Sequence, residues 1–207
     1  MGGDLDLPSF YQLVWFITDF GDAAMLLPVS FAVFLGLMAG RAYRVAGAWA
    51  LAILFCLLSM VALKLAFRTC GDLWTGDAVI SPSGHTAFST TVYGGLAGLV
   101  AIRTARPWLR VFAPVLAAAG IVGIGISRLL LRAHTPDEVL IGWGIGAVWV
   151  GLLCALSWRT PVRRRALAAV LCLVLVLVFL LHGDHAAIEA LLIQAAEILH
   201  RRFSICT

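Results

Sequence analysis

Residues 45–67 read VAGAWALAILFCLLSMVALKLAF, in which Lys64 is the only charged side chain. A helix that crosses the hydrocarbon core of a bilayer needs about 20 consecutive and mainly apolar residues. The stretch therefore predicts a transmembrane helix. Five further segments are similar in length and apolar content and are also predicted to span the membrane: residues 21–40, 83–102, 109–127, 137–158 and 166–181.

The composition of the whole chain agrees with a protein that lies in lipid. Of 207 residues, 62% are hydrophobic and 13% are charged, and the mean hydropathy is +1.00. A soluble domain has about 45–50% apolar and about 25% charged residues, so the composition disfavours a soluble globular protein. We expect an all-α polytopic membrane protein, a six-transmembrane-helix bundle in which residues 1–207 form a single membrane-embedded domain.

Both ends of the chain carry segments that favour the membrane surface. Residues 185–203 have apolar side chains at helical spacing, but charged residues interrupt them. This pattern is typical of a helix that lies in the interface and does not cross the bilayer, so we expect a C-terminal surface helix. An aromatic stretch, residues 10–16, precedes the first span, and such side chains favour the membrane interface.

The basic residues predict the orientation, because cytoplasmic loops carry the excess of lysine and arginine. Nine arginines lie in or beside the first, third and fifth connections between spans: Arg41, Arg44, Arg103, Arg106, Arg110, Arg159, Arg163, Arg164 and Arg165. Five lie on the opposite side: Arg68, Arg128, Arg132, Arg201 and Arg202. We therefore expect a protein of the bacterial inner (plasma) membrane with both termini and the connections 68–82 and 128–136 outside.

Several classes of binding site are excluded by residue spacing. The arginines lie in short breaks between apolar runs, whereas a nucleic-acid binder groups basic and aromatic residues on a polar surface. No pair of the five cysteines has the spacing of a zinc or redox motif. Asp19, Asp22, Asp72 and Asp77 lie near the outer side, but their spacing is unlike that of a hard-cation site. We predict no metal, no cofactor and no nucleic-acid partner, and the sequence does not specify the oligomeric state.

The two outward connections contain the residues that carry chemistry. The first runs from Lys64 through Arg68 to His85, and the second runs from Arg128 through His134 to the acidic pair at 137–138. Ionisable groups at membrane depth are costly and are therefore functional candidates. Together the connections offer cations, two histidines and a carboxylate pair, which suits an anion that is held while an imidazole attacks it.

Residues 82–85, Pro-Ser-Gly-His, are typical of a helix start. Proline followed by an N-cap serine leaves the first backbone N–H groups unpaired at the helix start. These groups and the helix dipole favour an anion, and Gly84 allows a phosphate to approach the backbone closely. His85 then lies in the first turn, beside the anion.

In the second connection, Ser127-Arg128 is followed after five residues by His134, a proline and two acids. The planar guanidinium of Arg128 can donate two hydrogen bonds to phosphate oxygens. A neutral histidine held in one tautomer is a competent nucleophile, and either Asp137 or Glu138 is placed to hold His134.

On these residues the chain resembles the type 2 phosphatidic acid phosphatase family, whose fold is shared with vanadium-dependent haloperoxidases. The resemblance covers residues 64–142, and two of the family's three motifs are present: residues 82–85, and Ser127-Arg128 with His134. It implies that His134 is the nucleophile and that His85 is the general acid. It also implies that the phosphate ligands are Ser83, the Gly84 amide and Arg128.

Two departures from the family pattern concern charged residues. The first motif is a lysine followed after six residues by Arg-Pro, but here Lys64 is followed at that position by Gly71-Asp72. Arg68 lies four residues after Lys64, on the same helical face, and is the candidate to replace the missing arginine. The family's carboxylate partner is an aspartate four residues after the histidine. Glu138 occupies that position and is preferred to Asp137.

The resemblance predicts a membrane lipid phosphate phosphatase with its active site at the outer face and a phosphohistidine intermediate. Its expected partners are a lipid phosphate substrate and membrane lipids. Undecaprenyl pyrophosphate, phosphatidylglycerol phosphate, phosphatidic acid and lipid A are all compatible substrates. The alternatives are a lipid phosphotransferase, a vanadate haloperoxidase, which the six apolar spans disfavour, and a non-enzymatic transporter or scaffold that retains the motifs.

Overall fold

The computed structural model describes residues 7–75, 81–160, 162 and 164–183. Every regular element within these residues is a helix. In chain order they are α1 (Leu7–Asp19), α2 (Ala23–Ala39), α3 (Tyr43–Thr75), α4 (Gly84–Ser89), the π-helical segment η1 (Thr90–Gly94), α5 (Gly95–Arg103), α6 (Pro107–Leu130), α7 (Pro136–Ser157) and α8 (Arg164–Leu181).

The prediction of an all-α polytopic membrane protein is confirmed. Each of the six predicted spans corresponds to a helix, and the third corresponds to the continuous run α4–η1–α5. Four helical stretches in the described residues are long and apolar enough to cross a membrane, the first of which includes most of α1 and all of α2: residues 9–39, 43–68, 107–130 and 136–157. The apolar part of α8, residues 168–181, is shorter, and six spans therefore remain a prediction. The predicted surface helix at 185–203 lies outside the described residues.

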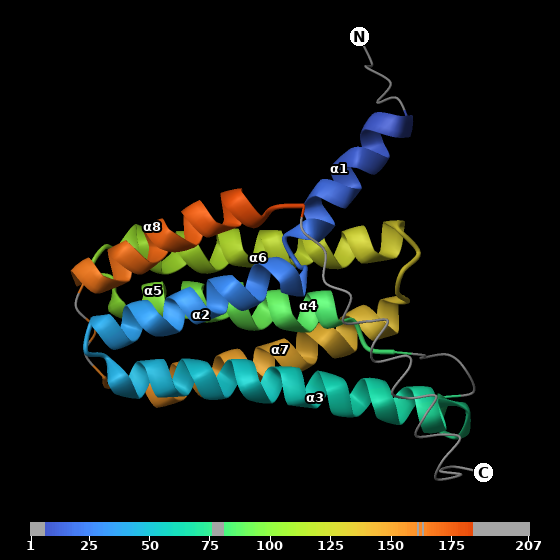
Figure 1. Cartoon of the computed structure of the whole chain (residues 1–207), viewed down its shortest axis with the longest axis horizontal. Helices are drawn as coiled ribbons and strands as arrows, with labels where there is room; N and C mark the ends of the chain where they lie inside the picture. The colour runs from blue at the N-terminus through green and yellow to red at the C-terminus, as the bar shows by residue number, and fades with distance from the viewer. Residues whose placement is uncertain (1–6, 76–80, 161, 163, 184–207) are drawn as a thin grey trace.

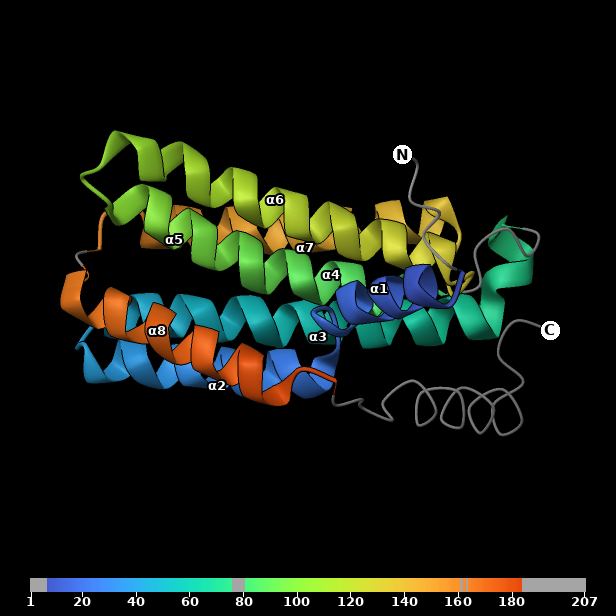
Figure 2. The ribbon, with the colours of Figure 1, turned by 90° about the horizontal axis from the view of Figure 1, so that it is seen from above.

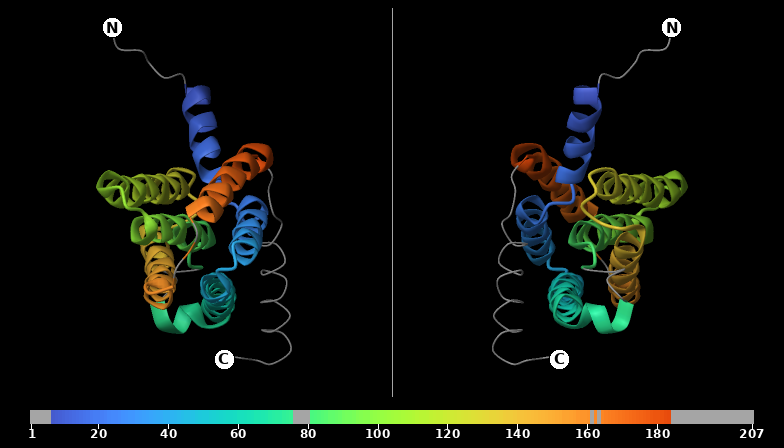
Figure 3. Two further views of the ribbon diagram at one scale, coloured as in Figure 1. Left: turned by 90° about the vertical axis from the view of Figure 1, so that its left-hand side faces the viewer. Right: turned by 90° about the vertical axis from the view of Figure 1, so that its right-hand side faces the viewer.

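The run α4–η1–α5 lies in the middle of the bundle. It contacts α3, α6 and α7, while α2 packs against α3 and α8, so that the long helices run side by side along the molecule (Figure 1, Figure 2). Helix α1 packs against α6 and projects away from the other helices (Figure 3). The run α4–η1–α5 therefore forms the centre of the bundle, in contact with α3, α6 and α7.

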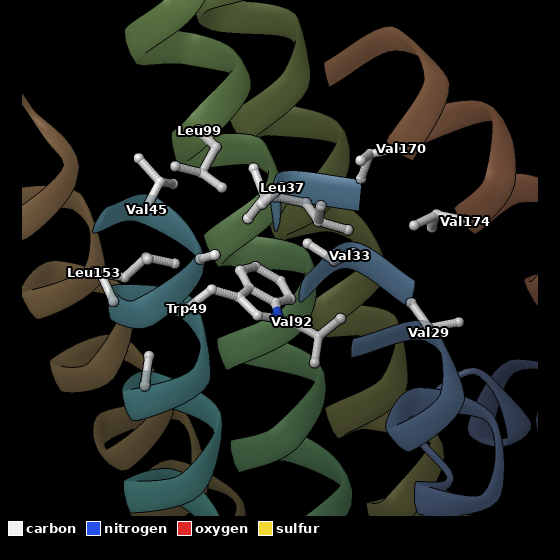
Figure 4. Close-up of a cluster of buried hydrophobic side chains, with 14 of the residues drawn as sticks. Val29, Val33, Leu37, Val45, Trp49, Val92, Leu99, Leu153, Val170 and Val174 are labelled. Carbon is white, nitrogen blue, oxygen red and sulfur yellow. The ribbon is translucent and has the colours of Figure 1, made fainter. Parts of the chain in front are cut away.

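Trp49 of α3 lies at the centre of the apolar core (Figure 4). Its side chain is 1% exposed, and its Nε1–H donates a hydrogen bond to the Ser30 backbone oxygen at 3.0 Å. Val33, Val92 and Leu153 from three other helices complete the core around it. On the outside, large apolar side chains such as Phe179 are mostly exposed, which suits contact with lipid and is unusual for a soluble protein.

Glycines bring α4 and α7 into close contact, as expected for helix packing in lipid. A Cβ added at Gly142 would lie 2.0 Å from Thr86 Oγ1 and 2.6 Å from the Ser83 oxygen. One added at Gly146 would lie 2.7 Å from the Ala87 oxygen. The start of α4, with residues 83–85, is therefore held directly against the start of α7.

Candidate active site

The residues predicted from the two outward connections meet at one end of the bundle. Helix α3 supplies Lys64, the start of α4 supplies His85, the last turn of α6 supplies Arg128, and the connection before α7 supplies His134. Lys64, Arg128 and His134 all lie close enough to His85 to affect its electrostatic environment. Residues far apart in the sequence are thus brought into one cluster.

Glu138 connects the two predicted motifs through several hydrogen bonds. Its Oε2 lies 2.8 Å from His134 Nδ1 and accepts a hydrogen bond from the Thr135 N–H at 3.1 Å. Its Oε1 accepts from the Ser81 N–H at 2.7 Å, and its backbone oxygen accepts from the Ser83 N–H at 3.1 Å. The carboxylate is therefore fixed on both oxygens, and the residue is 4% exposed.

The local sequence explains why Glu138 has this place. Thr135 is the N-cap of α7, and Pro136 occupies the first helical turn. The Thr135 hydroxyl accepts from the Glu138 N–H at 3.4 Å, while the Glu138 side chain returns to the Thr135 N–H, which together form a capping box. Asp137 is exposed. The structure thus places Glu138, and not Asp137, against His134.

His134 is arranged as a neutral imidazole whose Nδ1 contacts Glu138. Burial lowers the pKa of His134 from its ordinary value, and the positive charges of Arg128 and Lys64 lower it further, against the hydrogen bond and charge of Glu138. The ordinary pKa is about 6.5, so a lowered pKa means a neutral ring at pH 7. Because Nδ1 faces the carboxylate, Nε2 carries the lone pair.

The start of α4 presents groups that suit a phosphate. Ser83 is at the N-cap position, as predicted, but its side chain makes no capping hydrogen bond. Within the described part of the chain, the buried Oγ of Ser83 has no hydrogen-bond partner. The Lys64 side chain lies against Gly84, since a Cβ added there would be 3.6 Å from Lys64 Cε. A hydroxyl, a glycine and a cation therefore lie together at the helix start.

The two predicted arginines differ in how the structure places them. Arg128 affects the electrostatics of both histidines, and its Nη1 donates to the Thr18 hydroxyl at 3.3 Å. Arg68 is half-buried, one turn after Lys64 on α3. A role for Arg68 in phosphate binding stays a prediction.

One part of the cluster was not predicted from the sequence. The corner between α1 and α2 brings Asp22 to His85, with 3.7 Å between Asp22 Oδ2 and His85 Nε2. From the sequence, Asp22 was placed only near the outer side; in the structure it also caps α2 by accepting from the Ala24 N–H at 2.8 Å. The contact with His85 depends on tertiary packing, so no local pattern in the sequence predicts it.

The described residues contain no group of three or more histidine, cysteine, aspartate or glutamate side chains arranged to hold a metal ion. Metal-independent chemistry stays a prediction.

The cluster can be compared with known proteins. The PAP2 superfamily model matches residues 66–162. The uncharacterized 22.5 kDa protein in the cps region of Klebsiella pneumoniae is 34% identical over 195 residues, which cover 90% of each chain. Glucose-6-phosphatase 3 of mouse and of rat are 34% and 35% identical over 92 and 88 residues, which cover 41% of this chain and 25% of theirs.

No solved structure matches the chain. The Klebsiella protein matches over nearly its whole length, whereas this chain covers about a quarter of the two glucose-6-phosphatases. The region matched by the superfamily model contains both histidines, Arg128 and Glu138. The chain belongs to the PAP2 superfamily, the family of membrane phosphatases related to type 2 phosphatidic acid phosphatase.

Proposed function

We propose that the protein hydrolyses a phosphomonoester or pyrophosphate of a lipid through a phosphohistidine at His134. The observation that carries this proposal is the 2.8 Å contact between His134 Nδ1 and Glu138 Oε2. A carboxylate on Nδ1 keeps the proton on that nitrogen, so the Nε2 lone pair is directed away from Glu138. Because Lys64 and Arg128 lie near this ring, an anion is attracted to the nucleophile.

The proposed reaction has two steps, formation of the phosphohistidine and its hydrolysis. His134 Nε2 attacks phosphorus and forms a P–N bond as the bond to the leaving oxygen breaks, and His85 gives a proton to that oxygen. Water then attacks phosphorus and gives a proton to His85, the P–N bond breaks, and inorganic phosphate leaves. Lys64, Arg128, the Ser83 hydroxyl and the Gly84 amide stabilise the charge on the equatorial oxygens, which is most of what phosphoryl transfer requires.

The position of the cluster supports a lipid substrate. His85 lies at the start of α4, and Arg128 lies at the end of α6, a helix long and apolar enough to cross a membrane. The ends of spanning helices lie at the level of lipid head groups. A phosphate on a lipid head group can therefore reach the two histidines while its acyl chains stay in the bilayer.

A panel assay tests the proposal directly. Purified protein in detergent is incubated with phosphatidic acid, phosphatidylglycerol phosphate, undecaprenyl pyrophosphate and lipid A, and released phosphate is measured. A soluble sugar phosphate, glucose 6-phosphate, belongs in the panel because two relatives carry that substrate in their names. Release from the lipids supports the proposal. Release from the sugar phosphate alone would change the substrate class from a lipid phosphate to a soluble sugar phosphate. Phosphate found on an acceptor would indicate a phosphotransferase.

Substitution of Arg68 tests whether this residue replaces the arginine that is missing from the first motif. If Arg68 replaces the family's missing arginine, Arg68→Ala lowers activity as much as Arg128→Ala does, and Arg68→Lys restores part of it by returning the charge. Steady-state rates on the best lipid substrate provide the measurement. An Arg68→Ala rate within about threefold of the wild type, under about 1 kcal/mol of barrier, would show that Lys64 acts without it.

Sidedness is expected to follow the arginine distribution, with the histidine cluster at the outer (periplasmic) face of the membrane. Single cysteines at Ala133 and Ala105, both exposed and at opposite ends of the bundle, are introduced after the five native cysteines are replaced. An impermeant maleimide is expected to label the variant at 133 in intact cells and the one at 105 only after lysis. The reverse pattern would place the site in the cytoplasm.

A further inference from the structure

The corner between α1 and α2, residues 18–22, packs directly against the candidate active site. Asp22 Oδ2 lies 3.7 Å from His85 Nε2, an ion-pair distance, and the two side chains are 10% and 25% exposed. A Cβ added at Gly21 would lie 2.8 Å from Ile124 Cγ2 and 3.2 Å from His85 Cβ. The backbone of the corner therefore lies against the ring that is proposed to supply the proton.

The direction of the Asp22 carboxylate is fixed by the start of α2. Its Oδ1 accepts a hydrogen bond from the Ala24 N–H at 2.8 Å and so caps the helix. The second oxygen, Oδ2, is the one that faces His85. Asp22 is 7% exposed, and a carboxylate buried to this extent interacts more strongly with a neighbouring imidazolium than an exposed one does.

Two further contacts fix the corner to the site. The Thr18 hydroxyl accepts a hydrogen bond from Arg128 Nη1 at 3.3 Å. The Tyr93 hydroxyl donates to the Phe20 backbone oxygen at 2.8 Å, which joins the corner to η1. The corner thus contacts one proposed phosphate ligand, the proposed acid and the central helical run.

We propose that Asp22 is a positioning residue for His85, a role that rests on the proposed function. Its carboxylate, 3.7 Å from Nε2, attracts the Nε2–H of the protonated ring, so Nδ1 is the atom that gives a proton to the leaving oxygen and takes one from the attacking water. The negative charge also stabilises the protonated ring, which burial disfavours most and the charges of Arg128, His134 and Lys64 on the other elements disfavour further. The corner completes a second histidine–carboxylate pair beside that of His134 and Glu138.

The test separates proton donation from folding by means of the leaving group. Asparagine caps helices as well as aspartate does, so Asp22→Asn removes the charge and keeps the cap. Two substrates with alkyl tails of equal length are compared: an alkyl phosphate, whose alkoxide must be protonated, and a nitrophenyl phosphate, whose phenolate leaves without a proton. The first turnover is measured for both, because the later hydrolysis of the phosphohistidine is common to the two substrates.

Asp22→Asn is expected to slow the first turnover of the alkyl phosphate by about 10- to 100-fold, part of the 10²–10⁴-fold that general acid catalysis supplies. The aryl phosphate is expected to change by less than about threefold. His85→Ala shows the same selectivity with a larger loss, and adding Asp22→Asn to it costs nothing more, because residues that act as a unit are not additive. Asp137→Asn, the same charge change at an exposed position, leaves both rates unchanged.

Equal losses on the two substrates, or no loss on either, would overturn the role of Asp22. If Asp22→Asn does not fold, Asp22→Ser, which also caps α2 without charge, replaces it and is expected to give the same selectivity. A wild-type protein that cleaves no member of the lipid panel would instead refute the proposed function, so the two failures are distinguishable.

Discussion

Replacing His134 with alanine is expected to lower phosphate release by at least about 10³-fold, since removal of a catalytic nucleophile costs on that scale or more. The ring is held in a single tautomer by a carboxylate, at 2.8 Å, and kept neutral by a lowered pKa. Its loss leaves the phosphate ligands in place, so substrate binding is expected to persist. Single-turnover release of phosphate from the best lipid substrate provides the measurement.

Two controls accompany this variant. The His134 side chain is 8% exposed, so truncation removes packing, and thermal unfolding in detergent must show an intact fold. His134→Gln, which keeps more of the volume, is expected to be as inactive as His134→Ala. Wild-type protein quenched during turnover of a radiolabelled substrate is expected to carry phosphate that is stable in alkali and labile in acid. Normal phosphate release by either variant would remove the nucleophile assignment.

The apolar runs predicted the helices well because the thickness of the bilayer fixes their minimum length. They did not predict where helices end outside the lipid. Helix α3 extends from Tyr43 to Thr75, beyond the predicted 45–67, because backbone hydrogen bonding continues through Arg68 into polar residues. Hydropathy also did not predict the π-helical segment Thr90–Gly94, because the hydropathy of these five residues is the same in an α-helix and in a π-helix.

The proposed site followed from local spacing wherever spacing fixes geometry. Glu138 lies four residues after His134, and the capping box around Thr135 turns its side chain back onto the ring. The convergence of His85 and Arg128 required the resemblance to a family, since nothing local brings α4 to α6. Neither local spacing nor the family resemblance predicted the role of Asp22. Its contact with His85 depends on how the α1–α2 corner packs, and the family's motifs do not include it.

Glu138→Gln is expected to reduce turnover by about 10³-fold or more, because it reverses the tautomer of His134, and to lower stability by about 1–3 kcal/mol for the hydrogen bond it cannot keep. A glutamine has one acceptor oxygen, which can keep the hydrogen bond from the Ser81 N–H, while the hydrogen bond from the Thr135 N–H to the other oxygen is lost. Its amide N–H, however, can donate to His134 Nδ1, which would move the imidazole proton to Nε2 and remove the attacking lone pair. The equivalent change in a serine protease triad costs about 10⁴-fold.

Nitrogen NMR of histidine-labelled protein separates this effect from a loss of fold. In the wild type at pH 7 the proton of His134 is expected on Nδ1, and in Glu138→Gln it is expected on Nε2. Asp137 is an exposed carboxylate one residue away, and Asp137→Asn is expected to change neither the tautomer of His134 nor the rate. A Glu138→Gln variant with wild-type turnover would mean that the contact at 2.8 Å serves the helix start alone. An inactive variant with the wild-type tautomer would assign Glu138 to charge stabilisation of the ring during attack.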